Sequence, residues 1–132
     1  MLQRSLLAVI VLALQVSACD NSGLPAQYQQ LQIPQELLVS SEARARGRDL
    51  YLQHCALCHG VGADGKGVRQ NLSSRPRSFL DPTWKKRSSP RTVYHVIQEG
   101  LTGTAMPAWK ILDEDQTWDL VAYLLSVSEA GS

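Results

Sequence analysis

The chain has 132 residues, of which 44% are hydrophobic and 6% aromatic, and its formal net charge is +1. A chain of this length holds one compact domain with an extension, which excludes two ordinary domains. The apolar fraction is sufficient for a core, and the low aromatic content is easier to understand if a buried apolar group supplies part of the interior.

Residues 1–18 have the pattern of a bacterial export signal. Arg4 supplies a positive start, and the apolar run Leu6–Val16 that follows is too short to span a bilayer as a helix. The next residues, Val16–Cys19, resemble the lipobox of bacterial lipoproteins, in which the cysteine is acylated and becomes the mature N-terminus after cleavage. The alternative is an ordinary secretory signal, with Cys19 incidental.

Acylation of Cys19 predicts a protein on the periplasmic side of the bacterial membrane. Two or three acyl chains on one residue give a stable anchor, whereas a single chain does not. Asp20 follows, and an acidic residue at this position resembles the signal that retains lipoproteins of enteric bacteria in the inner membrane, which is therefore favoured. This location leaves no opportunity for nucleic acid as a partner.

Residues 19–40 are predicted to form a lipid-anchored flexible tether, and residues 41–132 the folded domain. The segment contains glycine, prolines and five glutamines, without a sustained apolar period. About twenty flexible residues have an r.m.s. span of roughly 25 Å, which would lift the domain off the headgroups and let it swivel.

The domain shows three helical patterns and no credible strand alternation, so the predicted fold class is all-α. The first helix follows a serine cap and extends over about 41–54. The second, over 90–99, begins with serine and proline and stops at a glycine. The third begins near 114 with a cap and a glutamine three residues on. Residues 60–86 are expected to form a long loop, with a short helix near 83–87.

The most informative motif comes directly after the first helix, at Cys55-Ala56-Leu57-Cys58-His59. Two thiols three positions apart, followed at once by a histidine, are the attachment signature for c-type haem. Each thiol adds across a haem vinyl group to form a thioether, and His59 is then held beneath the iron as its proximal ligand. We therefore expect one haem c, bound covalently through Cys55 and Cys58.

Two other interpretations of the cysteines are a redox Cys-x-x-Cys pair and half of a zinc site. A redox pair would be expected in a thioredoxin-like βαβ pattern, and a structural zinc would need a second pair of ligands. The sequence shows neither. If Cys19 carries lipid and Cys55 and Cys58 carry haem, all three cysteines are used and no disulfide is expected.

Met106 is the expected sixth ligand of the iron. It is the only methionine left once the signal is removed, and it lies in a loop with glycine and proline on its two sides, between two helices. A thioether favours Fe(II), so His/Met ligation should raise the reduction potential. The alternative for Met106 is core packing. The two remaining histidines, His54 and His95, are expected at the surface.

Together these motifs resemble those of class I c-type cytochromes, specifically a bacterial monohaem domain. The resemblance covers residues 43–127, through four motifs: Cys55–Gly60, Gly65–Gly67, Gly103–Pro107 and Val121–Leu124. It implies an all-α fold of three to five helices wrapped around one covalently bound haem, with His59 and Met106 as axial ligands. It also implies electron transfer through an exposed haem edge.

The family pattern implies further contacts. The first and last helices should cross, with Gly47 permitting close approach and Tyr51 packing against Leu120 and Tyr123. A loop proline carbonyl, which the pattern assigns to Pro76, should accept the Nδ1–H of the proximal imidazole. Trp109 is expected to cover the haem edge beside the sixth ligand.

The charged residues are unevenly distributed. Arg44 to Arg91 holds eleven basic and three acidic residues, whereas Glu99 to Glu129 holds six acidic and one basic. Such polarity could orient the molecule on a charged partner, although solvated faces without a docking role are the alternative.

The expected function is that of a membrane-anchored one-electron carrier, cycling haem Fe(II)/Fe(III) between respiratory or dehydrogenase partners. It is expected to be a monomer or a subunit of a respiratory complex, and not an enzyme in its own right. One alternative is a haem protein that binds small ligands such as NO or CO after Met106 dissociates. Another is a haem subunit permanently docked in an oxidoreductase complex.

Overall fold

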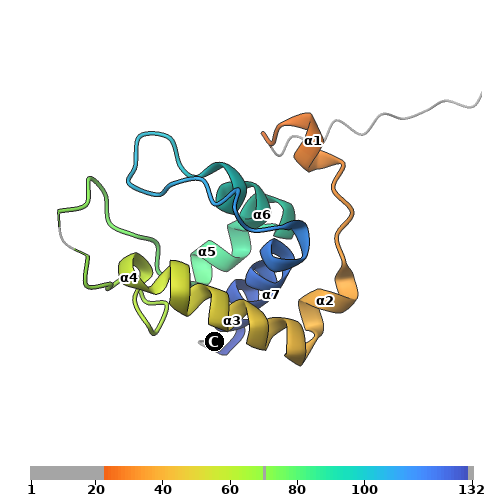
Figure 1. The fold of residues 1–132 in the computed structure, drawn as a ribbon, viewed down its shortest axis with the longest axis horizontal. Coiled ribbons are helices and arrows are strands. Elements are labelled where there is room, and N and C mark those ends of the chain that lie inside the picture. Colours follow the sequence, from red (N-terminus) through yellow and green to blue (C-terminus); the bar gives the residue numbers. More distant parts are fainter. Residues whose placement is uncertain (1–22, 70, 131–132) are drawn as a thin grey trace, which may run out of the picture.

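The structure is a computed structural model that describes residues 23–69 and 71–130; Cys19 and the proposed signal lie outside this range. The described residues contain helices and no strands, which confirms the predicted all-α class. Figure 1 shows the helical segments in chain order. They are α1 (Ala26–Gln29), α2 (Gln35–Val39), α3 (Ser41–His54), α4 (Ala56–His59), α5 (Pro82–Arg87), α6 (Pro90–Glu99) and α7 (Glu114–Ala130).

The three long helices begin where their caps predict. The side chains of Ser40 and Ser89 cap α3 and α6, each accepting a hydrogen bond from the amide three residues on, and Pro90 occupies the first turn of α6. At the start of α7, the Asp113 carboxylate accepts from the Gln116 amide at 2.8 Å, and the Gln116 side chain accepts from the Asp113 amide at 3.1 Å. This reciprocal pair is a capping box.

α3 and α7 cross closely, as the sequence predicts. A Cβ atom at Gly47 would overlap the backbone carbonyl of Asp119, so a hydrogen at this position is what allows the contact. The rings of Tyr51 and Tyr123 pack beside it, with centroids 5.3 Å apart. Arg46 donates two hydrogen bonds to the buried Asp119 carboxylate, at 2.7 and 2.8 Å. These two bonds satisfy a charge that would otherwise be costly to bury.

The core lies between α3, α6 and α7. Its fully buried side chains include Tyr51, Trp118, Leu120 and Val121. Near the end of α7, Glu129 forms salt bridges at 3.6 Å with Arg44 of α3 and with Lys85 of α5. Among the residues that the structure describes, no helix is long and apolar enough to cross a membrane.

The prediction of a flexible tether over residues 19–40 is wrong for the part that the structure describes. Residues 24–40 form two short helices, and α1 packs on α6 while α2 packs on α3 and α7. Leu24 and Tyr28 are each only 8% exposed. The apolar side chains here are interspersed with glutamine and proline without a regular period, so their burial depends on partners remote in sequence. The predicted domain itself holds five helical segments, α3 to α7, in agreement with the three to five expected, and α1 and α2 add two more among the described residues.

We expect Gly47→Ala to destabilise the holoprotein by about 3 kcal/mol, because the added methyl group forces α3 and α7 apart. Gly62→Ala is the matched control, since a Cβ atom there meets nothing within 4 Å. Guanidinium unfolding followed by circular dichroism measures both free energies. Equal values for the two variants would contradict the close crossing.

Candidate functional site

The cysteine motif forms a single helical turn, α4, directly after α3. The amides of Cys58 and His59 both donate to the Cys55 carbonyl, at 3.1 and 2.9 Å. Gly60 ends the turn with a φ of +83°, a conformation that glycine adopts without strain. Tyr51 donates its hydroxyl proton to the Gly60 carbonyl at 2.6 Å, which ties this end to α3. The turn fixes the spacing of the two thiols and of the histidine.

The loop after α4 folds back onto the motif. The Gly65 amide donates to the His59 carbonyl at 2.8 Å, and the Gly67 amide to the Cys58 carbonyl at 3.1 Å. A Cβ atom at Gly67 would overlap the Leu57 and Cys58 carbonyl groups. The glycines of the Gly65–Gly67 motif therefore allow backbone to lie directly on backbone. The carbonyl groups at the end of α4 are satisfied in this way.

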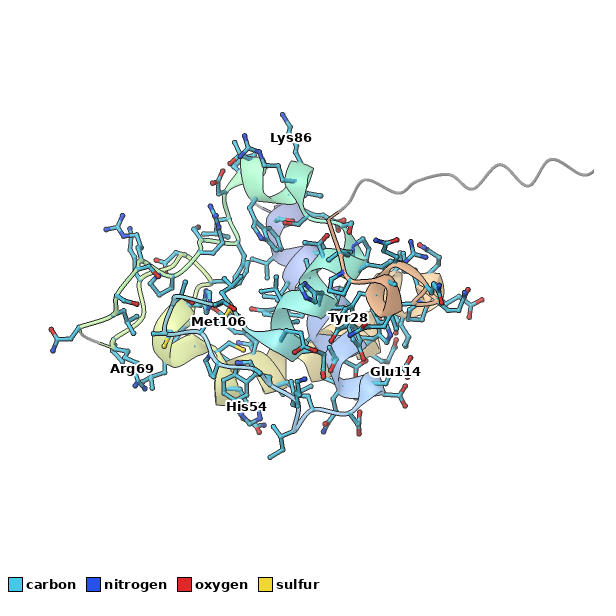
Figure 2. All side chains as sticks on the ribbon, turned by 90° about the horizontal axis from the view of Figure 1, so that it is seen from above. Tyr28, His54, Arg69, Lys86, Met106 and Glu114 are labelled. Carbon is cyan, nitrogen blue, oxygen red and sulfur yellow. The ribbon has the colours of Figure 1, made fainter. Side chains whose placement is uncertain are left out.

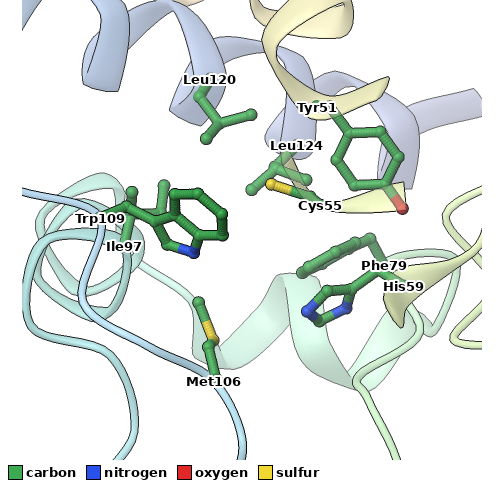
Figure 3. Close-up of a pocket in the computed structure, with 9 residues that line it drawn as sticks. All are labelled: Tyr51, Cys55, His59, Phe79, Ile97, Met106, Trp109, Leu120 and Leu124. Atoms are coloured by element: carbon green, nitrogen blue, oxygen red, sulfur yellow. The ribbon is translucent and has the colours of Figure 1, made fainter. Parts of the chain in front are cut away.

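An apolar pocket opens beside the motif. Figure 3 shows the His59 ring and the Met106 side chain pointing into this cavity from two different segments. The lining residues come from α3, α4, α6, α7 and the loops: Tyr51, Cys55, His59, Phe79, Ile97, Met106, Trp109, Leu120 and Leu124. The structure thus brings together the predicted residues Cys55, His59, Met106 and Trp109, which are up to 54 positions apart in the sequence.

The orientation of His59 suits a metal ligand. Its Nδ1 lies 3.0 Å from the Arg77 carbonyl oxygen, and a ring that donates from Nδ1 leaves Nε2 unprotonated and free to bind a metal. The Phe79 ring stacks against it with centroids 4.8 Å apart. Burial lowers the pKa of His59 below its ordinary value, which favours the neutral imidazole that metals require.

The carbonyl that faces His59 belongs to Arg77, so the prediction of Pro76 is wrong by one residue. The Pro76 carbonyl instead lies against Gly65, where it would be 2.7 Å from a Cβ atom. Neighbouring carbonyls of a non-helical segment point in different directions, so the contact of one with Gly65 leaves the next to face the imidazole. The expected type of contact is present, but a different residue makes it.

Met106 is held by a loop that closes on α6. The Leu101 amide donates to the Met106 carbonyl at 3.2 Å, and the Met106 amide donates to the Thr104 hydroxyl at 3.1 Å. At the other end, the Trp109 amide donates to the Ile97 carbonyl of α6 at 2.9 Å. Half-buried Met106 is therefore presented to the cavity by backbone constraints rather than by packing in a helix.

The two thiols have different surroundings. Burial, with a smaller effect of Cys58, raises the pKa of the Cys55 thiol to about 12, and Cys55 is the one that lines the cavity. Neither of them forms a disulfide. No group of three or more His, Cys, Asp or Glu side chains in the described part of the chain is placed to hold a metal ion, so the second ligand pair of a zinc site is not found there.

The other two histidines do not line the cavity, and each packs against an aromatic ring. His54 packs on Trp109, with ring centroids 5.2 Å apart, and His95 packs edge-on to Tyr28 at 4.6 Å. Both were expected at the surface, and both are half-buried. His95 is half-buried because residues 24–40 pack on α6, which the sequence did not predict.

These residues fit a haem. An imidazole and a thioether face the same apolar space, and two thiols with the required spacing lie beside it. The walls are aromatic and aliphatic, which suits a large apolar macrocycle. Phe79, Ile97 and Leu124 also form part of the wall, which the sequence motifs do not indicate. Of the three, only Phe79 could have been singled out, because it is the only phenylalanine of the chain.

Comparisons with known proteins show similarity over the region that contains this site. Residues 42–124 match the family described as cytochrome c oxidase, cbb3-type, subunit III. Cytochrome c55X of Stutzerimonas stutzeri is 32% identical over 90 residues, which are 65% of this chain and 66% of that protein, slightly less than two thirds of its length.

A solved structure is also similar. It is a chain of the Kuenenia stuttgartiensis reducing HAO-like protein complex Kustc0457/Kustc0458, with 28% identity and a TM-score of 0.57. The similar region covers 76% of this chain and 46% of that chain. Because the family match includes α3, the cysteine motif, the Met106 loop and most of α7, this chain belongs to the cytochrome c family, in the group described as cbb3-type subunit III.

Proposed function

We propose that this cytochrome is a one-electron carrier anchored to the periplasmic side of the bacterial membrane, with the inner membrane favoured. Bound haem supplies a reversible Fe(II)/Fe(III) couple. Cys55 and Cys58 would hold it covalently, and His59 and Met106 would bind its iron. The protein exchanges electrons with respiratory or dehydrogenase partners.

The observation that carries this proposal is the pair of side chains at the cavity. His59 and Met106 both point into it, so the chain itself can supply both axial ligands. Iron with both axial positions filled by protein transfers electrons and has no open position for a substrate. The Arg77 carbonyl supports the proximal ligand, and the closed loop on α6 supports the distal one.

The charge distribution supports steering of partners. Lys66 and Arg69 lie exposed beside the cysteine motif, and Lys86 and Arg87 lie exposed at the end of α5. An acidic partner would be attracted to these faces, with an association rate that falls as salt is added.

A second candidate function is that of a haem subunit docked permanently in an oxidoreductase complex. The similar Kuenenia chain belongs to a protein complex, which favours this alternative. The two candidates differ in whether the protein remains monomeric at its native concentration after extraction from the membrane.

Replacement of Met106 tests the axial ligand. We expect Met106→Ala to lose the weak near-infrared charge-transfer band of ferric His/Met haem, to lower the reduction potential and to bind CO when ferrous, whereas the wild type does not respond to CO. Leu101→Ala is the matched control, because this side chain lies 45% exposed in the same loop. A high-spin wild type that CO readily changes would instead favour binding of small ligands.

Replacement of Cys19 tests the anchor. We expect the wild type, produced with c-haem maturation, to sediment with membranes and to incorporate a fatty-acid label. Cys19→Ser should appear in the soluble periplasmic fraction with an unchanged haem spectrum, because the haem thiols are untouched. An unlabelled, soluble wild type would contradict lipidation and leave the electron carrier itself intact.

A further inference from the structure

Residues 24–40, called the brace below, are fixed to the domain at several points. Tyr28 inserts against α6, where its ring contacts Tyr94 at 6.3 Å and His95 at 4.6 Å between centroids. Its hydroxyl donates to the Glu99 carboxylate, which also forms a salt bridge with Lys110 at 2.9 Å. The first turn of the brace is thus held by both apolar and charged contacts.

Two arginines of the domain hold the rest of the brace by its backbone. Arg91 donates from Nε to the Leu31 carbonyl at 2.9 Å. Arg44 donates from Nε and Nη2 to the Leu38 carbonyl, at 3.1 and 2.9 Å. Between these points, Ile33 and Leu37 pack partly buried against the core. The brace therefore moves with the domain.

The brace begins at the end of the molecule remote from the cysteine motif. Figure 1 shows α1 and α4 at opposite ends of the longest axis, and Figure 2 shows Tyr28 and Arg69 on opposite sides after a turn of 90° about that axis. Met106, which lines the cavity, lies toward the Arg69 side. The electron-transfer site and the start of the brace thus face in different directions.

The length of chain between Cys19 and the brace is small. Five residue steps from Cys19 to Leu24 span at most about 17 Å, whereas the 22-residue tether expected from the sequence would reach about 75 Å when extended. Residues 21–35 also contain no charged side chain. A stretch without charge adds no electrostatic repulsion of its own from zwitterionic or anionic headgroups.

We propose that the brace sets the orientation of the cytochrome on the membrane. The side that carries α1 faces the lipid surface at short range, and the side that carries Met106 and Arg69 is directed away from it. This inference rests on the lipidation of Cys19 proposed above. The brace makes the domain a fixed-orientation carrier, with its cavity presented to partners that extend from the membrane.

Spin labels on two faces test this orientation. Cys55 and Cys58 are thioethers in the holoprotein and Cys19 is acylated, so an introduced cysteine is the only free thiol. We would label Gln27→Cys and Arg69→Cys separately, bind each holoprotein to phosphatidylcholine vesicles that contain a gadolinium-chelate lipid, and measure relaxation of the label by electron paramagnetic resonance. We expect at least threefold stronger relaxation enhancement at position 27 than at position 69.

Variants of the brace provide the controls. Tyr28→Ala, which removes the ring contacts, should make the two positions more nearly equal, whereas Tyr28→Phe keeps the rings in place and should preserve the difference. A ten-residue Gly-Ser insertion between Gly23 and Leu24 leaves the brace packed but lengthens its connection, and it should also abolish the difference. An unchanged haem spectrum shows that each variant is folded.

The outcomes separate the two proposals. A wild type that does not float with vesicles overturns the lipid anchor, and with it the orientation. A wild type that floats but relaxes equally at positions 27 and 69 overturns the orientation alone. Persistence of the difference in the Gly-Ser insertion variant would likewise show that the short connection does not set it.

Discussion

The close crossing of α3 and α7 is the contact on which the rest of the structure depends. It requires a hydrogen in place of a side chain at Gly47, because the Asp119 carbonyl occupies the space of a Cβ atom. The crossing fixes where α3 ends, and therefore where α4 starts and where the two thiols lie. It also brings Leu120 and Leu124 of α7 to the same cavity as His59. One small residue thus determines the position of the motif relative to its apolar wall.

Features encoded by neighbouring residues could be predicted from the sequence. The caps at Ser40, Ser89 and Asp113 give the starts of the long helices, since each needs only a side chain and an amide a few positions away. The cysteine motif could be recognised for the same reason, because α4 is a single turn. The closeness of α3 and α7 was predictable through the family resemblance, which supplied the partner of Gly47.

Features that depend on remote partners could not be predicted in this way. The apolar residues of the brace, such as Tyr28 and Leu31, follow no single helical period, because they pack on different elements. The Tyr28 hydroxyl donates to the carboxylate of Glu99, which lies 71 residues later in the sequence. That the Arg77 carbonyl, and not that of Pro76, faces the His59 imidazole has another cause. Which carbonyl faces the ring depends on the local path of the chain, and composition does not determine that path.

The backbone closure of the Met106 loop bears on the speed of electron transfer. Because hydrogen bonds at Leu101 and Trp109 hold both ends of the loop near α6, the fold itself sets the position of the Met106 thioether. A ligand held in this way changes position little when the metal gains or loses an electron. Little structural rearrangement then accompanies each transfer, which keeps the activation barrier low in both directions. For the carrier proposed above, a loop of ordinary length would thereby favour fast as well as reversible electron transfer.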